Sequence, residues 1–585
     1  MADLFTRFKP GDIPLNEYPR PQLRRAAWQN LNGWWEYTLQ DAAAFWQAFS
    51  AGAPYPWRAP DAYVGRILVP FCFESVLSGA GRPVGPQTLM VYRRAFSVDH
   101  YDAGKRTLLH FGAVDYACIV YVNGAEAGRH EGGFCPFSFE ITDLLQEGEN
   151  ELCVCAADPT DAADMPRGKQ VLHPKGIWYT GVSGIWQTVW LEQVPRVYLQ
   201  GLRFTPALDS VTVEADCEVP VELTVLEGEQ PVACAAVAGR AVLALPEPKH
   251  WTPEHPFLYR VKIAAGEDRA ESYFALRTFG IGPGPSGRPC LLLNGRPYFQ
   301  KGLLDQGYWP DGLYTAPTDT ALCLDIENAK SLGFNMLRKH IKVEPARWYY
   351  HCDRLGMLVW QDMPSGGTCT DFWVHVAAPN LGRQLPEGRV ERAVRRTPAG
   401  RAAQERQLAE MVAALYNAPC ICLWVPFNEG WGQFDAARIA AAVRQMDPTR
   451  PVDHASGWHD QGAGDLLSRH RYILPLRPPR CAEGEERAFA VTEYGGYSQV
   501  VPGHVWSEQN SFGYVMFKDS VRLTAAYRKL HRRQVLPLLR AGLCAVVYTQ
   551  LTDVEGEVNG LFTYDRALCK VDGETVRRIN AELTF

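Results

Sequence analysis

The character of the sequence changes near residue 286, and this change limits the folds that the chain can adopt. Before it, short apolar runs are separated by turn signals such as Asn123-Gly124, and helical periodicity is nearly absent. After it, apolar strands alternate with predicted helices, which is the order of βαβ units. The 585 residues therefore predict a multidomain protein, with β sandwiches first and an α/β domain after them.

Two changes in the sequence pattern, near residues 195 and 285, divide the chain into three predicted domains. Residues 1–195 predict a jelly-roll β-sandwich, and residues 196–285, whose strands alternate cleanly, predict an immunoglobulin-like β-sandwich. Residues 286–585 predict a C-terminal (β/α)8 TIM barrel. The boundaries fall at Val194-Pro195 and at the Gly/Pro-rich run 282–287.

Polar residues follow the apolar run of one predicted barrel strand after another. In a barrel of this kind, the carboxyl ends of the strands meet at a single mouth, where the active site lies. A single polar residue at such a position can simply begin a loop, but a series of them favours a shared site. The series consists of Asp305, Arg338, His340, Asp362, Asn428, Glu429, Glu493 and Asp553.

Glu429 and Glu493 carry the chemistry in this series. The apolar run 420–427 leads into Asn428-Glu429-Gly430, and the run 488–492 leads into Glu493-Tyr494-Gly495. Cleavage of a glycosidic bond requires two carboxylates, one to protonate the leaving oxygen and one to attack or stabilise the anomeric carbon. The pair therefore predicts a glycosidase.

Composition excludes several other classes of protein. A net charge of -6 lacks the basic excess of a nucleic-acid-binding surface, and 46% hydrophobic residues argue against disorder. No apolar stretch is long enough to span a membrane. The N-terminal segment lacks the apolar region of a signal peptide, so we expect a cytoplasmic location. The 16 cysteines form no CxxC pair and are expected to be reduced structural thiols.

Motifs along almost the whole chain resemble glycoside hydrolase family 2, which includes β-galactosidases, β-glucuronidases and β-mannosidases. Trp28-Gln-Asn-Leu-Asn-Gly-Trp-Trp and Val120-Tyr-Val-Asn-Gly are similar to its sugar-binding jelly roll. Gly333-Phe-Asn-Met-Leu-Arg, Phe427-Asn-Glu-Gly and Thr492-Glu-Tyr-Gly are similar to segments of its barrel. The occurrence of these motifs in one order makes the resemblance specific.

The resemblance implies a role for several residues. Glu429 would be the acid/base, Glu493 the nucleophile, and Asn428 the group that hydrogen-bonds the sugar 2-hydroxyl. Tyr472 matches a tyrosine that contacts the nucleophile. A retaining exo-β-glycosidase acting on a small glycoside or oligosaccharide is expected, without a cofactor. No metal is expected either, because the chain stops directly after the barrel, whereas metal-using β-galactosidases of the family continue. The remaining substrate-binding candidates are Asp305, Arg338, His340, Asp362, Trp458, Tyr548, Glu557 and Asn559.

The sequence departs from the family pattern at the residues that select a uronic acid. β-Glucuronidases of the family carry an Asn-x-Lys pair before a Gly-Leu-Phe-Thr-x-Asp-Arg segment, and here those positions are Glu557 and Asn559. An acidic Glu557 would repel a carboxylate, so a neutral hexose such as galactose is our first expectation. A glucuronide or galacturonide stays open, since Arg338, Lys339 or Lys342 could bind a carboxylate, and an arabinoside stays open as well.

Two readings from other classes are weaker. A catalytically dead carbohydrate-binding protein usually lacks one carboxylate, and both are present here. A metal-dependent hydrolase would need clustered ligands at strand ends, which His454, His459 and His470 do not provide. The irregular segment 365–398 is interpreted as a lid, with Trp373 as a candidate sugar platform, and a disordered insertion stays open as the alternative. The two β domains could supply loops to the pocket or form the interface of a homo-oligomer.

Overall fold

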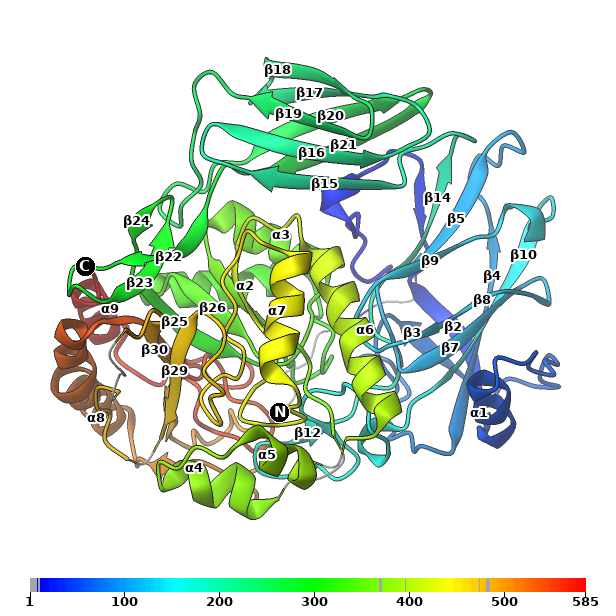
Figure 1. Ribbon diagram of the computed structural model, residues 1–585. Coiled ribbons are helices and arrows are strands. Elements are labelled where there is room, and N and C mark those ends of the chain that lie inside the picture. Colours follow the sequence, from blue (N-terminus) through cyan, green and yellow to red (C-terminus); the bar gives the residue numbers. More distant parts are fainter. Residues whose placement is uncertain (1–7, 9–10, 368–370, 395, 473, 480–483) are drawn as a thin grey trace.

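The computed structural model describes residues 8, 11–367, 371–394, 396–472, 474–479 and 484–585. Three bodies follow one another along the chain: a large β sandwich at the right of Figure 1, a smaller pair of sheets at the top, and an α/β barrel below it. Both sandwiches contact the barrel directly. The side chain of Gln407 donates to Tyr116 of the large sandwich, and that of Arg203 in the small sandwich donates to the carbonyl of Met446.

The large sandwich consists of two antiparallel sheets that enclose an apolar core containing Trp35, Tyr92 and Phe111. Apolar side chains on alternate positions of each strand face this core, which confirms the predicted jelly-roll domain. The first sheet contains β3 (Gly65–Val69), β2 (Gly33–Asp41), β4 (Thr88–Ser97), β10 (Glu149–Ala157), β7 (Ala117–Val122) and β8 (Ala125–Glu131), in that order. The second contains β1 (Trp28–Asn30), β14 (Val189–Val194), β5 (Arg106–Phe111) and β9 (Phe137–Glu140).

The small sandwich has the strand number and alternation expected of an immunoglobulin-like domain. Val221, Leu223 and Val225 point inward from one strand, while Glu222 is exposed between them. One sheet contains β15 (Gly201–Pro206), β16 (Ser210–Asp216) and β19 (Arg240–Ala244). The other contains β18 (Gln230–Val237), β17 (Val221–Glu227), β20 (Tyr259–Ala265) and β21 (Asp268–Phe274).

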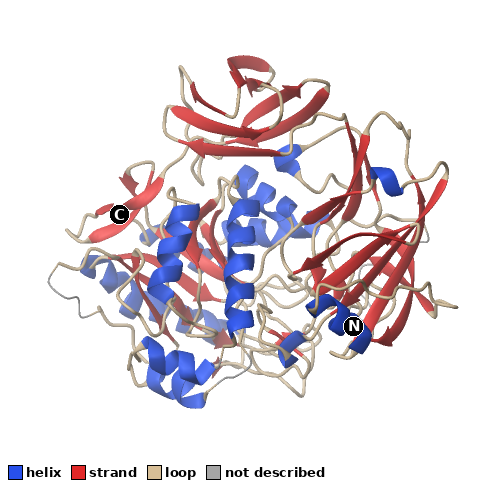
Figure 2. Ribbon diagram, turned by 45° about the vertical axis from the view of Figure 1, so that its right-hand side comes forward, coloured by secondary structure: helices blue, strands red, loops and turns tan. Residues whose placement is uncertain are grey.

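Seven parallel strands form the wall of the barrel, and Figure 2 shows them surrounded by helices. Isolated parallel bridges join Trp424 to Val452 and Asn428 to Ser456, so residues 452–456 take the eighth strand position and confirm the predicted barrel. The seven strands are β28 (Ile421–Val425), β27 (Leu358–Asp362), β26 (Met336–Lys339), β25 (Gln300–Asp305), β33 (Leu543–Thr549), β30 (Ala488–Gly495) and β29 (Leu466–Arg471).

Local sequence signals set the ends of the barrel helices. The side chain of Thr318 accepts a hydrogen bond from the backbone N–H of Ala321 and caps the start of the first helix, as its sequence predicts. Gly356 ends the second helix with a left-handed φ of 73°, which glycine adopts without strain. The outer layer comprises α2 (Asp319–Ser331), α3 (Ala346–Leu355), α6 (Pro398–Leu415), α7 (Ala436–Met446), α8 (Ser520–Leu530) and α9 (Gly573–Glu582).

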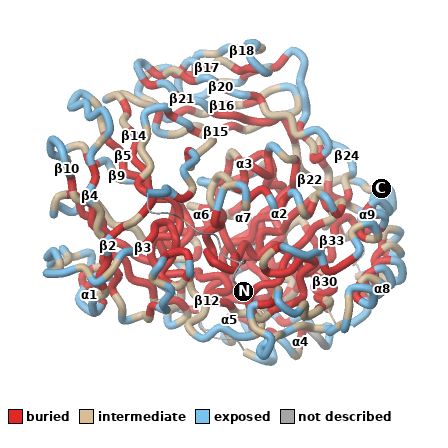
Figure 3. Tube along the Cα trace, turned by 180° about the vertical axis from the view of Figure 1, so that it is seen from behind, coloured by how far each residue is buried: buried red, intermediate tan, exposed pale blue. Residues whose placement is uncertain are grey.

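The barrel interior is the most deeply buried part of the molecule, and the outer faces of the helices and sandwiches are exposed (Figure 3). No described helix has the length and apolarity to cross a membrane. The 14 cysteines in the described part of the chain are free thiols. Their placement in strands such as β10 and β28 explains why most of them are buried.

The segment 365–398 is more regular than its sequence pattern predicts. It contains a π-helical turn at Trp373–Ala377, α4 (Ala378–Asn380) and α5 (Glu387–Val394), which share a small apolar core. The cluster Arg392, Arg395, Arg396 and Arg401 is expected from the sequence to form a solvated face. This expectation is wrong for Arg396, which is buried and forms an ion pair with Asp164 at 2.6 Å. The sequence could not show this, because Asp164 belongs to the jelly-roll domain. Arg395 lies outside the described residues.

Candidate active site

The two glutamates lie at the carboxyl ends of barrel strands on opposite sides of the mouth. Glu493 belongs to β30, and Glu429 lies in the turn after β28. Glu429 has a left-handed φ of 52°, which is uncommon for a residue with a side chain. Its backbone N–H donates to the carbonyl of Ser456 at 3.0 Å, and this bond anchors the turn. Strain of this kind is found where a side chain must be held in one direction.

The carboxylates of Glu429 and Glu493 are close enough to act on the same bond. One oxygen of each, together with a ring nitrogen of His470, fall within 4.8 Å of one another. Carboxylates about 5 Å apart leave no room for a water molecule between one of them and the sugar, so that carboxylate attacks the anomeric carbon directly. Both residues are at least 95% buried, which removes competing solvent.

Arg338 of β26 is the central cation of the site. Its guanidinium donates to Glu493 at 3.0 Å, to Asp362 at 3.0 Å and to Asn428 at 2.7 Å. The hydroxyl of Tyr472 also donates to Glu493, on the other carboxylate oxygen. Two donors on one carboxylate are arranged to stabilise negative charge on Glu493, which suits the role of a nucleophile.

The surroundings of Glu429, in contrast, favour its protonated form. Burial raises the pKa of its carboxyl to about 7, although the positive charges of Lys169 and Arg338 act to lower it. A carboxyl group with this pKa keeps its proton up to neutral pH and can donate it to a leaving oxygen. The site thus combines a carboxyl group that keeps its proton with a carboxylate that accepts two hydrogen bonds, an arrangement that suits the two roles in glycosidic cleavage.

His470 lies between the two glutamates and connects them. A guanidinium can only donate, so Nε2 of His470 accepts from Arg338 at 3.3 Å. The ring proton is then on Nδ1, which donates to Glu429 at 2.8 Å. Burial lowers the pKa of His470 to about 4, so the ring is neutral under ordinary conditions. His470 therefore positions Glu429 without adding a charge.

The pKa of Glu429 predicts how activity depends on pH. We expect kcat/KM for a phenyl glycoside to fall about tenfold per pH unit above pH 7 to 8, because the proton donor is lost as its raised pKa is passed. A pH–rate profile measures this directly, and Glu429→Gln serves as the control because it has no proton to lose. A wild-type profile that stays flat to pH 9 would contradict the assignment of Glu429 as the acid.

The structure brings together most of the residues that the sequence predicts at the site. His340 shares Asp362 with Arg338, and its Nδ1 lies 3.0 Å from that carboxylate. The side-chain nitrogen of Asn428 is buried and has no partner among the described residues, so it is ready to bind a ligand oxygen. Trp458 lies at the edge of the site, with its ring centroid 6.1 Å from that of His470.

Four other predicted residues, Asp305, Asp553, Glu557 and Asn559, are paired with other side chains of the protein. Asp305 forms an ion pair with Lys339 at 2.6 Å, on the side of β26 opposite to Arg338. Glu557 accepts a hydrogen bond from Asn559 at 2.7 Å and another from the hydroxyl of Tyr179. Glu557 still acts electrostatically on Glu429 and raises its pKa, so this pair borders the site. Asp553, also in the strand-end series, is paired with Lys570 at 2.6 Å.

Tyr548 faces away from the carboxylates. Its ring packs against Tyr494 and Tyr527, with centroids 5.5 and 5.1 Å apart, between β33 and α8. The next residue, Thr549, approaches the hydroxyl of Tyr472 at 3.4 Å and so faces the mouth. Because side chains alternate along a strand, Tyr548 must point to the helix layer. The structure thus places this predicted substrate contact outside the site.

Four residues near the carboxylates were missed or undervalued by the sequence argument. The sequence does not distinguish His470 from an ordinary loop or core histidine. Tyr514 stacks on Tyr472 with a centroid distance of 4.3 Å. Lys169 and Tyr179 come from the jelly-roll domain, on a segment that no barrel motif includes. The sequence carries no signal for them, because their position depends on how two domains pack.

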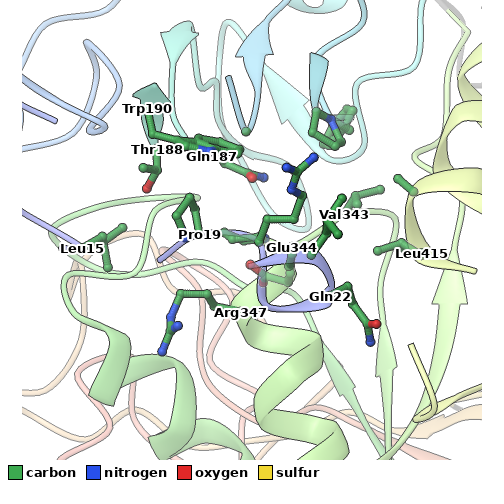
Figure 4. A pocket seen from close by; sticks show the side chains of 18 of the residues that line it. Leu15, Pro19, Gln22, Gln187, Thr188, Trp190, Val343, Glu344, Arg347 and Leu415 are labelled. Atoms are coloured by element: carbon green, nitrogen blue, oxygen red, sulfur yellow. The ribbon is translucent and has the colours of Figure 1, made fainter. Parts of the chain in front are cut away.

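The described residues offer one group with metal-like spacing, and it is Glu429, His470 and Glu493 themselves. Arg338 already donates to His470 and Glu493 there, so a metal ion would meet a fixed positive charge. A separate cavity of about 370 Å³ lies between the jelly roll and the barrel helices. Figure 4 shows Gln187, Thr188 and Trp190 on one side of it and Glu344 and Arg347 on the other. Its lining includes neither catalytic glutamate.

Three family models match successive parts of the chain. Residues 22–195 match "Glycosyl hydrolases family 2, sugar binding domain", and residues 197–280 match "Glycosyl hydrolases family 2". Residues 291–477 match "Glycosyl hydrolases family 2, TIM barrel domain". These matches follow the order of the three bodies in the structure.

Curated relatives match most of the chain at low sequence identity. A β-galactosidase of Alteromonas mediterranea is 26% identical over 491 residues, covering 75% of this chain and 43% of the relative. One of Thermoanaerobacter pseudethanolicus is 26% identical over 437 residues, covering 69% and 54%. The chain thus spans about half the length of the curated relatives it matches.

Solved structures share the fold over nearly their whole length. A β-glucuronidase of Ruminococcus gnavus has a TM-score of 0.74 at 18% identity and covers 97% of this chain and 99% of its own. A family 2 β-galacturonidase of Eisenbergiella tayi has a TM-score of 0.69 at 19% identity, covering 98% of both chains. With the three domain matches and the relatives, this shows that the chain belongs to glycoside hydrolase family 2.

Proposed function

We propose that the protein is a retaining exo-β-glycosidase with Glu493 as nucleophile and Glu429 as acid/base. The observation that carries the proposal is the close approach of two buried carboxyl groups, within 4.8 Å, in opposite electrostatic surroundings. Arg338 and Tyr472 stabilise the charge of Glu493, while burial keeps the proton on Glu429. An intact pair of this kind is also the argument against a carbohydrate-binding protein without activity.

The reaction proceeds in two displacements. In the first, a carboxylate oxygen of Glu493 attacks the anomeric carbon, the glycosidic C–O bond breaks, and Glu429 transfers its proton to the departing oxygen. In the second, Glu429 takes a proton from water, and the water oxygen replaces Glu493 at the same carbon. Each step inverts the centre once, so the product keeps the configuration of the substrate.

The enclosed position of the carboxylates supports exo action. Glu429 and Glu493 are 5% and 3% exposed, and Arg167 and Gly168 of the jelly roll donate hydrogen bonds to the carbonyl of Ser365 in the barrel domain. Trp178 of that domain packs against Trp431, two residues after the acid, with ring centroids 4.9 Å apart. A site closed in this way accepts a terminal sugar and leaves the aglycone toward the entrance.

The identity of the sugar is the finer part of the proposal. The curated relatives named above are β-galactosidases, which supports a β-galactoside and agrees with the expectation from Glu557. The solved structures that match end to end are a β-glucuronidase and a β-galacturonidase, and a β-uronide is the second candidate. The position of Lys169, a cation close enough to Glu429 to act on its pKa, favours the second candidate.

The stereochemical course tests the proposed mechanism. We expect proton NMR of the early reaction mixture to show the β anomer of the released sugar first, followed by slow mutarotation to the equilibrium mixture. The substrate is chosen from p-nitrophenyl β-galactoside, β-glucuronide, β-galacturonide, β-mannoside, β-glucoside and α-L-arabinosides. First appearance of the opposite anomer would require a water between the carboxylates and would overturn the double displacement.

A further inference from the structure

A segment of the jelly-roll domain, residues 167–169, enters the mouth of the barrel. The backbone N–H groups of Arg167 and Gly168 both donate to the carbonyl of Ser365, at 2.9 and 3.0 Å. Gly168 has a φ of +64°, and a Cβ atom there would lie 2.6 Å from the carbonyl oxygen of Ile341. The approach is therefore close enough that only glycine fits. Ile341 follows His340, so the next jelly-roll residue, Lys169, is delivered beside the active site.

Lys169 is a buried residue whose ammonium group has no anionic partner among the described residues. The residue is 5% exposed, and within the described part of the chain its Nζ has neither a hydrogen bond nor a carboxylate oxygen within 4 Å. Its Nζ lies over the ring of Tyr179, 5.2 Å from the centroid. The charge of Lys169 acts to lower the pKa values of both Glu429 and His340, which places it near the reacting centre.

The other buried lysines show what such a group normally requires. Lys339 pairs with Asp305 at 2.6 Å and Glu344 at 2.8 Å, and Lys342 pairs with Glu344 at 2.9 Å. Lys570 pairs with Asp553 at 2.6 Å. A buried charge without such a partner is costly, so it is retained where a ligand supplies the partner. Lys169 is the buried lysine of the described chain that lacks a carboxylate, and it faces the substrate site.

We propose that Lys169 binds the carboxylate of a terminal hexuronic acid, so that the site prefers β-D-galacturonides or β-D-glucuronides over the matching neutral hexosides. This inference rests on the proposed glycosidase function and names its substrate class. A single unpaired cation matches a single negative charge, whereas a phosphate or sulfate with several charged oxygens would need more donors. The sugar carboxylate at C5 is a monoanion of the required kind.

The position of Glu557 is compatible with this assignment. Its two oxygens already accept from Tyr179 and from Asn559, so the carboxylate is not presented bare to the substrate. Tyr179 separates the two charges, with its ring toward Lys169 and its hydroxyl on Glu557. The sequence argument against a uronide considered Glu557 alone, because Lys169 lies almost 390 residues earlier in the chain.

A substitution series at Lys169 tests the proposal. The readout is the ratio of kcat/KM for p-nitrophenyl β-D-galacturonide and β-D-glucuronide to that for the matching galactoside and glucoside. We expect Lys169→Met to lower this ratio by roughly 10- to 100-fold, the loss expected when a charge-assisted hydrogen bond to the substrate is removed. Lys169→Gln should lower it as well, and Lys169→Arg should retain part of it. Lys175→Met is the matched control, since Lys175 is exposed on the same segment.

The outcomes separate this inference from the proposed function. An unchanged ratio in Lys169→Met, or a wild-type enzyme that prefers the neutral hexosides, overturns the role of Lys169 while the glycosidase proposal stands. If no substrate is hydrolysed, the glycosidase proposal fails, and binding of D-galacturonate and D-galactose by calorimetry then tests Lys169 alone. Galacturonate that binds more tightly than galactose, with the difference lost in Lys169→Met, supports the site. Equal binding of the two sugars overturns it.

Discussion

Glu493→Ala should abolish turnover of every glycoside substrate, with a loss in kcat of about 10⁴- to 10⁶-fold, the range seen when an enzyme loses its nucleophile. The carboxylate of Glu493 forms the covalent bond to the sugar, so a better leaving group cannot compensate for its absence. Activated and unactivated substrates should therefore lose activity to a similar extent. The measurement compares kcat for a 2,4-dinitrophenyl and a phenyl glycoside of the preferred sugar.

The environment of Glu493 explains why no neighbour can replace it. Arg338 and Tyr472 converge on this carboxylate, and Asp362 is turned toward Arg338 and His340. Glu508→Ala is the control, because this glutamate is exposed in the same domain. Added azide should restore turnover of the dinitrophenyl glycoside in Glu493→Ala and give an α-glycosyl azide, since azide attacks from the vacated face. Residual activity within tenfold of wild type would refute the assignment.

Glu429→Ala should give a loss that depends on the leaving group. General acid catalysis contributes about 10²- to 10⁴-fold, so a phenyl glycoside should lose activity over that range. A dinitrophenolate departs without a proton, and its first step should be nearly as fast as in the wild type. The glycosyl-enzyme should then accumulate, because no base activates water, and a burst of dinitrophenol should precede a slow steady state.

Azide distinguishes the two variants by stereochemistry. In Glu429→Ala the sugar is already bound to Glu493, so azide should accelerate the second step and give a β-glycosyl azide. Mass spectrometry of the protein should show the trapped sugar on the peptide that contains Glu493. Equal losses for good and poor leaving groups would mean that Glu429 is not the proton donor, and an α-azide would mean that the two roles are exchanged.

Much of the site can be predicted from the sequence, because the barrel fold determines where the ends of its strands lie. Parallel strands in a barrel direct their carboxyl ends to one mouth, so the residues that follow apolar runs share a location. This rule, with the family motifs, predicts that Arg338, Asp362, Asn428, Glu429 and Glu493 lie together. Tyr472 was placed by resemblance, and its hydrogen bond to Glu493 agrees with that placement.

The rule does not predict on which face of a strand a side chain lies, or which residues distant in the sequence pack against it. Asp305 and Tyr548 lie on barrel strands as predicted, yet Asp305 pairs with Lys339 and Tyr548 faces the helices. A position at the end of a strand does not give the face on which a side chain lies, because a shift of one residue reverses it. His470 looked like an ordinary histidine, since its significance comes from simultaneous contacts with Arg338 and Glu429.

The order of the three domains and the pair of glutamates follow from the sequence, because periodicity and strand-end motifs are local properties of the chain. The tertiary structure alone decided which charges meet: the shared Asp362, the neutral His470, the hydrogen-bonded Glu557 and the unpaired Lys169. Electrostatic interactions depend on distance and burial, and residues such as Lys169 and Glu429, which are 260 positions apart, acquire both only when the domains pack.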